Sequence, residues 1–163
     1  MSQINVNNLT FYYEGSYDNI FENVSFQLNT DWKLGFIGRN GKGKTTFLNL
    51  LMGKYEYKGK ISASVMFDYF PFEIKDKEKN TIDVIEEIYP EYEFWKICRE
   101  LNFLQMDADI FYRPFYTLSN GEQTKVLLAL LFTKENHFLL IDEPTNHLDI
   151  DTREILKRYL NNK

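Results

Sequence analysis

The sequence has few of the residues on which several classes of protein depend. It contains one cysteine, Cys98, and two histidines among 163 residues, so no internal disulfide can form and a zinc site has little support. Its formal net charge of -5 argues against a stand-alone nucleic-acid binder, whose surface is usually basic. The longest apolar run, Val126 to Phe132, is too short to cross a bilayer, and the first residues lack the regions of a signal peptide. These features predict a cytoplasmic protein without direct membrane insertion.

The length of 163 residues predicts one domain, residues 1–163, and the 44% of hydrophobic residues predicts that it has an apolar core. Lys33–Ile37 predicts a short strand that runs into Gly38, and helical spacing after Lys44 predicts a helix that stops at Gly53. The stretch 74–117 interrupts the α/β alternation and predicts a small helical insertion. The remaining patterns predict strands at 4–13, 24–28, 61–70 and 137–141, helices at 81–89, 92–104 and 121–133, and a last helix capped by Asp151.

The segment Gly38-Arg-Asn-Gly-Lys-Gly-Lys-Thr45 matches the phosphate-binding pattern G-x-x-x-x-G-K-[ST]. Between a strand and a helix, consecutive backbone N–H groups can wrap the β- and γ-phosphates of a nucleotide. Lys44 adds a positive charge, Thr45 offers a hydroxyl to Mg²⁺, and the helix N-terminus adds a favourable dipole. The alternative is a glycine turn before an ordinary helix, and a chance match is expected in roughly one sequence in a hundred of this length. The predicted phosphate ligands are Gly38, Arg39, Asn40, Gly41, Lys42, Gly43, Lys44 and Thr45.

Two adjacent acids, Asp142 and Glu143, follow the apolar run 138–141. Asp142 is predicted to hold Mg²⁺, usually through water, and Glu143 to accept the proton of an attacking water. The alternative is a strand that runs into an acidic turn, because Pro144 ends the strand in any case. Because the same chain contains the phosphate-loop pattern, the metal site is favoured over the acidic turn.

A third segment, Leu118-Ser-Asn-Gly-Glu122, precedes the apolar run of a predicted helix. Its Ser-x-x-Glu spacing predicts a capping box, in which Ser119 caps the helix and Glu122 bonds back to it. A helix N-terminus of this kind is also an anion site. The two interpretations are compatible.

With these residues together, the chain resembles the nucleotide-binding domain of ATP-binding cassette (ABC) proteins over residues 4 to 160. Leu118–Glu122 resembles the cassette signature, and Asp142-Glu-Pro-Thr-Asn-His-Leu-Asp149 resembles the acidic strand end and D-loop of the ABC-F branch, which lacks membrane domains. The segments 119–125 and 32–38 are most similar to ABC-F proteins that protect ribosomes from antibiotics.

The resemblance implies an α/β P-loop NTPase fold with an N-terminal antiparallel β-subdomain, and ATP clamped between two ABC domains. It implies that Tyr13 stacks on adenine, although a core strand tyrosine is the alternative, and that Thr46 lies near the α-phosphate. Asp149 corresponds to the D-loop acid at the interface between the two domains. The signature residues Ser119, Gly121 and Glu122 would contact the ATP held by the other domain.

The implied partners are a second ABC domain, in the same polypeptide or in a head-to-tail dimer, and the ribosome. The implied function is ATP hydrolysis by a ribosome-associated resistance or translation factor. One alternative is the ATP-binding subunit of a membrane transporter, although Pro144-Thr-Asn-His147 favours the ABC-F branch. Another is that this chain by itself is an inactive nucleotide-binding fragment.

Three departures from the family pattern bear on activity. Asn120 replaces a signature glycine, and Phe72 stands where the family has a glutamine that contacts the metal. Either Glu73 replaces that glutamine or the contact is absent. The family also has a further core strand, ending in a histidine, that would follow Lys163. We therefore expect a C-terminally incomplete domain of marginal stability, because a missing central strand exposes ladder groups and apolar surface.

Overall fold

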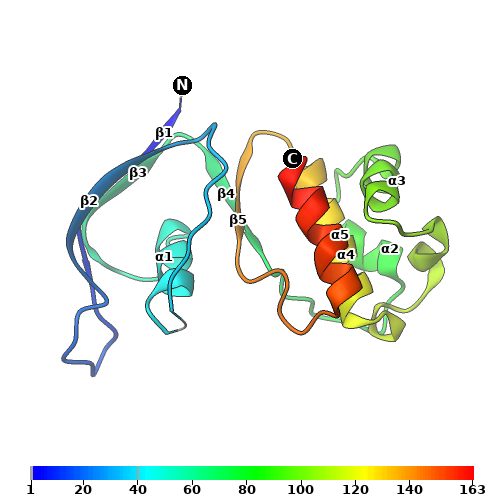
Figure 1. The fold of residues 1–163 in the computed structure, drawn as a ribbon, viewed down its shortest axis with the longest axis horizontal. Coiled ribbons are helices and arrows are strands. Elements are labelled where there is room, and N and C mark those ends of the chain that lie inside the picture. The colour runs from blue at the N-terminus through cyan, green and yellow to red at the C-terminus, as the bar shows by residue number, and fades with distance from the viewer. Residues whose placement is uncertain (1, 40) are drawn as a thin grey trace. The chain divides into compact units, whose positions relative to one another are not determined.

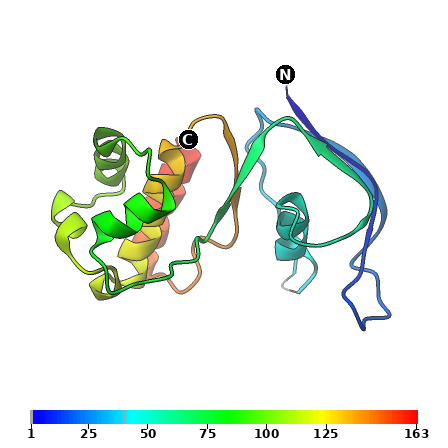
Figure 2. The same cartoon turned by 180° about the vertical axis from the view of Figure 1, so that it is seen from behind.

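The computed structural model describes residues 2–39 and 41–163, which form two compact units. The first unit contains the chain up to Tyr69 together with Asn136–Asp142, and the second contains Phe70–Glu135 and Glu143–Lys163. Figures 1 and 2 show the chain from opposite sides. No helix in the described residues is long and apolar enough to span a bilayer.

A three-stranded antiparallel sheet forms most of the first unit. Its order is β2-β1-β3, with β1 at Gln3–Phe11, β2 at Phe21–Asn29 and β3 at Lys58–Ala63. β1 is antiparallel to both neighbours, which confirms the predicted β-subdomain. The sheet curves around helix α1, Lys44–Leu51, in both views (Figures 1 and 2).

The core of the first unit lies between β1 and α1. Ile4 and Val6 point inward at the alternating spacing of a strand, and both are essentially buried. A register shift follows Val6, next to Asn8 with its positive φ of 51°, and the shift turns Leu9 inward as well. α1 contributes an apolar face to the same core, with Phe47, Leu50 and Leu51.

The predicted strand at Lys33–Ile37 is wrong, because these residues adopt no regular secondary structure. Ile37 is 90% exposed, and Leu34 and Phe36 are about half exposed. A strand is defined by its hydrogen-bonded neighbours, and β-propensity alone does not hold a segment extended. The segment has no strand partner among the described residues, so its apolar side chains remain on the surface.

The β-rich stretch 61–70 contains two strands. After β3 the chain turns and forms β4, Met66–Phe70. β4 pairs with β5, His137–Ile141, in a separate two-stranded sheet. Near the end of β4, the Tyr69 hydroxyl contacts Asp142, the residue that follows β5.

The second unit is helical, and its central helix is α4, Asn120–Thr133. Every residue of 125–131 is buried, as expected of a helix that is apolar around its circumference. Helices α2, Thr81–Ile88, and α3, Phe94–Phe103, precede it in the chain, and α3 packs against it. α5, Ile150–Asn161, runs alongside α4 (Figure 2), where Phe132 and Tyr159 meet edge to face at 5.3 Å.

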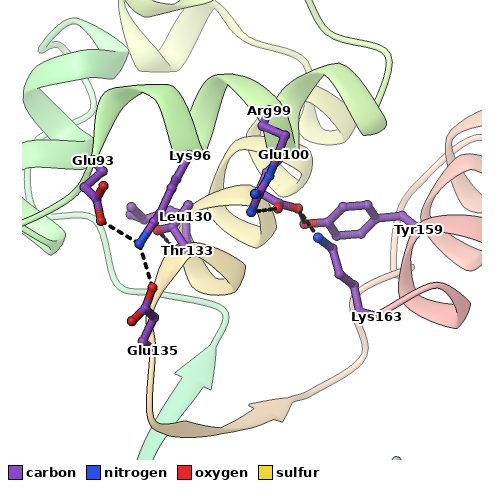
Figure 3. Close-up of polar contacts among 9 residues, drawn as sticks. All are labelled: Glu93, Lys96, Arg99, Glu100, Leu130, Thr133, Glu135, Tyr159 and Lys163. Carbon is purple, nitrogen blue, oxygen red and sulfur yellow. Dashed lines mark hydrogen bonds and ion pairs between the residues drawn. The ribbon is translucent and has the colours of Figure 1, made fainter.

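A buried carboxylate joins α3 to α5 (Figure 3). Glu100 of α3 is fully buried; it accepts a hydrogen bond of 2.7 Å from the Tyr159 hydroxyl and pairs with Arg99 at 3.1 Å and with Lys163. Burial by itself would raise the pKa of Glu100, but the bonds from Lys163 and Tyr159 outweigh it and lower this pKa below its ordinary value. The ionised carboxylate therefore stabilises the packing of the two helices.

Candidate nucleotide-binding site

The phosphate loop, Gly38–Thr45, enters helix α1 through two glycines with left-handed backbone. Gly41 has φ 75° and Gly43 has φ 90°, a region that residues with a side chain rarely adopt. Gly43 is the N-cap of α1 without a side-chain cap, so backbone N–H groups of the first turn remain available to an anion. A Cβ on Gly43 would lie 2.7 Å from Ile20 Cγ2. Asn40, also predicted here, lies outside the described residues.

The ammonium group of Lys44 lies within this loop. Its Nζ donates to the carbonyl oxygens of Gly38 at 2.8 Å and Arg39 at 3.2 Å. The backbone N–H of Lys42 bonds the Arg39 carbonyl at 3.3 Å and closes the turn. The loop thus gathers a positive charge and a helix N-terminus within one short stretch of chain, as phosphate binding requires.

Thr45 and Asp142 come together although they lie 97 positions apart in the sequence. The Thr45 hydroxyl donates to Asp142 Oδ2 at 2.6 Å, and the Tyr69 hydroxyl donates to the same oxygen at 2.9 Å. Hydroxyl and carboxylate oxygens are the hard ligands that Mg²⁺ prefers. A hydroxyl that donates its proton keeps lone pairs for a cation, so the donor set fits magnesium. The contact of Tyr69 with Asp142 could not be predicted from the sequence, because it depends on the pairing of β4 with β5.

Tyr13 and Thr46 form a second contact beside the loop. Tyr13 is 40% exposed, its hydroxyl lies 2.8 Å from Thr46 Oγ1, and its ring meets Phe11 and Tyr55 edge on. This exposure disfavours the alternative of a core tyrosine. Adenine stacking on Tyr13 and contact of Thr46 with the α-phosphate stay predictions.

The second unit contains the signature segment, Leu118–Glu122, at the start of α4. Ser119 Oγ accepts from the Glu122 backbone N–H at 3.2 Å, and Glu122 Oε2 accepts from the Ser119 N–H at 2.7 Å. The predicted capping box is therefore confirmed. Burial would raise the pKa of Glu122, but the bonds from Ser119 and from Arg113, 3.1 Å away, outweigh it and lower this pKa. Arg113 belongs to no recognised sequence motif, so its contact with Glu122 could not be predicted.

Asp149, and not Asp151 as predicted, caps helix α5. Its carboxylate accepts from the backbone N–H and the hydroxyl of Thr152, both at 2.8 Å. Asp151 already lies in the first helical turn, past the non-helical position that a cap residue occupies. The bonds from Thr152, the backbone bond first, lower the pKa of Asp149. Thr152 also touches the signature segment, because a Cβ on Gly121 would lie 3.1 Å from Thr152 Oγ1.

Glu143 is exposed and has a positive φ of 44°, an unusual backbone conformation for a residue with a side chain. The side-chain amide of Asn146 donates to its carboxylate. Strained backbone of this kind clusters at functional sites. Phe72 is half-buried with Lys134 above its ring, and Glu73 is exposed, so whether Glu73 replaces the missing glutamine stays a prediction.

The ABC transporter family matches this chain over residues 21–146. "ABC transporter F family member 3" of Arabidopsis thaliana is 31% identical over 84% of this chain and 20% of its own length. "ATP-binding protein Uup" of Haemophilus influenzae is 36% identical over 78% of this chain and 21% of its own length. The chain therefore spans about a fifth to a third of the curated relatives it matches.

Solved structures share the fold. One described as the ATP-binding protein of an ABC transporter from Pyrococcus furiosus matches with a TM-score of 0.82 and 20% identity, over 98% of this chain and 85% of that one. A bacterial Atm1-family ABC exporter with ATP bound matches with a TM-score of 0.80 and 18% identity, over 99% of this chain and 32% of that one. These likenesses confirm the predicted α/β fold of an ABC nucleotide-binding domain. The chain belongs to the ABC transporter ATP-binding domain family, with relatives in its F branch at about 30% identity.

Proposed function

We propose that the first unit binds Mg-ATP as one half-site of an ABC-F type ATPase. The observation that carries this proposal is the bond of 2.6 Å between Thr45 and Asp142, next to the phosphate loop. Backbone N–H groups at residues 38–46, where described, would hold the phosphates together with Lys44. Tyr13 would contact the base, through the face that its 40% exposure leaves open.

Thr45 and Asp142 would hold Mg²⁺ through hard oxygens. The ion, when bound, neutralises charge that develops on the phosphate oxygens. Glu143, the next residue, would accept a proton from the attacking water. Its exposed carboxylate is oriented by Asn146, which supports a role as a base.

The signature segment would serve a second nucleotide, held by another ABC domain. Its support is the capped N-terminus of α4, with Ser119 exposed and Gly121 packed on Thr152. Asp149 would lie at the same interface. The second domain would belong to the same polypeptide or to a head-to-tail partner, and the relatives' greater length supports the first arrangement.

A cytoplasmic ribosome-associated role in resistance or translation is our proposal for the whole protein. It rests on the F-branch relatives and on the motif Pro144-Thr-Asn-His147. The alternative, an ATP-binding subunit of a membrane transporter, draws on the Atm1-family exporter, a likeness that shows the fold alone. A transporter subunit would co-purify with membrane-spanning proteins, whereas an ABC-F protein would sediment with ribosomes in the presence of ATP.

For this chain alone we propose nucleotide binding without robust turnover. The Phe72 side chain has no oxygen to offer a metal, and Lys33–Ile37, which leads into the phosphate loop, is exposed and adopts no regular secondary structure. Both features weaken the preorganisation that hydrolysis requires.

Phosphate release by the chain, with and without Glu143→Gln, tests this proposal. We expect slow release that changes little with the substitution, while ATP binding persists in both proteins. Robust turnover that Glu143→Gln abolishes would instead show that the chain is a complete ATPase. Sustained turnover that survives the substitution would remove Glu143 from the proposed chemistry.

A further inference from the structure

Tyr69 is a polar side chain beside Asp142 to which the sequence patterns assign no role. It lies in β4, the hydrogen-bonded neighbour of β5, and Asp142 directly follows β5. Its hydroxyl reaches Asp142 Oδ2 at 2.9 Å. The distance is that of a good hydrogen bond to a carboxylate.

Two hydroxyls therefore converge on one carboxylate oxygen, since Thr45 donates to the same Oδ2 at 2.6 Å. Donors from two separate elements, α1 and β4, restrict the rotation of the carboxylate more than either does alone. Thr45 has a second task in the proposed function, because its oxygen would also bind the metal. Tyr69 has no such task, so its bond can orient Asp142 independently of the metal.

The ring of Tyr69 is itself held in place. Lys54, which follows α1, places its ammonium group 4.8 Å from the centre of the ring. The ring is half-buried, and its backbone belongs to a paired strand. A side chain fixed in this way suits positioning better than direct ligation.

We propose that Tyr69 is a positioning residue for Asp142, which holds the carboxylate in the orientation that Mg²⁺ requires. This inference rests on the proposed function. Removal of a residue that orients a metal ligand through a hydrogen bond typically lowers metal affinity about 10- to 100-fold.

The test is a Tyr69→Phe substitution, which removes the hydroxyl and keeps the ring over Lys54. ATP affinity of the chain is measured by calorimetry with Mg²⁺ and with EDTA, and Mn²⁺ affinity is measured by electron paramagnetic resonance in the presence of ADP. We expect metal affinity to fall about tenfold and metal-free ATP affinity to stay within twofold. The matched control is Tyr57→Phe, because Tyr57 is a half-buried tyrosine packed on the same core; we expect no change in metal affinity.

A double-mutant cycle with Asp142→Asn separates positioning from general support of the fold. Tyr69→Phe should have no further effect on metal affinity once Asp142 is changed. Equal losses with and without Asp142→Asn, or unchanged metal affinity in Tyr69→Phe, would overturn the positioning role while ATP binding stands. Failure of the unsubstituted chain to bind ATP under either condition would overturn the proposed function and the positioning role together.

Discussion

At the scale of single residues, two glycines show how the same backbone angle can have different consequences. Gly43 has φ 90° and Gly15 has φ 81°. A Cβ on Gly43 would lie 2.7 Å from Ile20 Cγ2 and 3.2 Å from Phe21 Cζ, whereas a Cβ on Gly15 would meet no atom within 4 Å. A side chain at position 43 would therefore be opposed both by steric contact and by the backbone conformation. A side chain at position 15 would be opposed by the backbone conformation alone.

Substitution of the two glycines separates these restrictions. Gly43→Ala should lower the free energy of unfolding by about 2–4 kcal/mol, from strained backbone plus displacement of Ile20. Gly15→Ala should cost about 1 kcal/mol, because only the backbone conformation opposes it. Urea unfolding followed by circular dichroism measures both values. Equal losses for the two variants would contradict the close packing of the phosphate loop on Ile20.

The site residues that could be predicted from sequence are those in segments with a fixed local order. The phosphate loop, Asp142 and the capping box of Ser119 and Glu122 are of this kind. The roles of Tyr69 and Arg113 could not be predicted, because each depends on a contact with a residue distant in the sequence or outside any motif, Asp142 for Tyr69 and Glu122 for Arg113. Asp149 rather than Asp151 caps α5 because the cap position depends on where the chain leaves the D-loop, which spacing alone locates only to within two residues.

At the scale of elements, helices with an apolar face were predicted well, and strands only where a neighbour exists. α1, α4 and β5 lie close to their predicted positions. Lys33–Ile37 has the propensity of a strand but belongs to neither sheet formed by the described residues. Sheet formation is a tertiary event, so a local pattern cannot establish it.

The packing of α3 on α5 should depend on pH through Glu100. Its pKa in the folded chain is lowered, so the ionised carboxylate contributes stability above the unfolded pKa, about 4.3. This contribution is lost as pH falls through the folded pKa. Glu100→Gln should therefore cost about 1–3 kcal/mol at pH 7, and the difference from the unsubstituted chain should shrink below about pH 4.

Unfolding in urea at pH 7 and pH 3.5 measures this effect. Glu154→Gln is the matched control, because Glu154 also lies on a helix of this unit but forms an exposed pair with Lys157 at 3.6 Å. Exposed pairs contribute little to stability, so the control should unfold like the unsubstituted chain at both values. If Glu100→Gln lowered the free energy of unfolding equally at both pH values, the packing of the side chain and not its charge would account for the loss.

At the scale of the whole molecule, the described residues divide into two half-sites on two units. The phosphate loop and Asp142 belong to the first unit, and the signature segment and Asp149 belong to the second. Glu143, the proposed base of the first half-site, directly follows Asp142 in the chain and is the first residue grouped with the second unit after it. Each half-site has its own internal contacts, through Thr45 in the first and Thr152 in the second.

The central claim is that the first unit binds ATP through Lys44 and the phosphate loop. Calorimetric titration of the chain with ATP and Mg²⁺ tests this claim most directly. The titration is repeated with Lys44→Ala and with a control variant, Lys60→Ala, which removes the same charge from an exposed position of β3. Removal of a charge-assisted bond to phosphate should weaken ATP binding about 10- to 100-fold, whereas Lys60→Ala should leave it within twofold. ATP binding that is absent from the unsubstituted chain, or that Lys44→Ala leaves unchanged, would contradict the account.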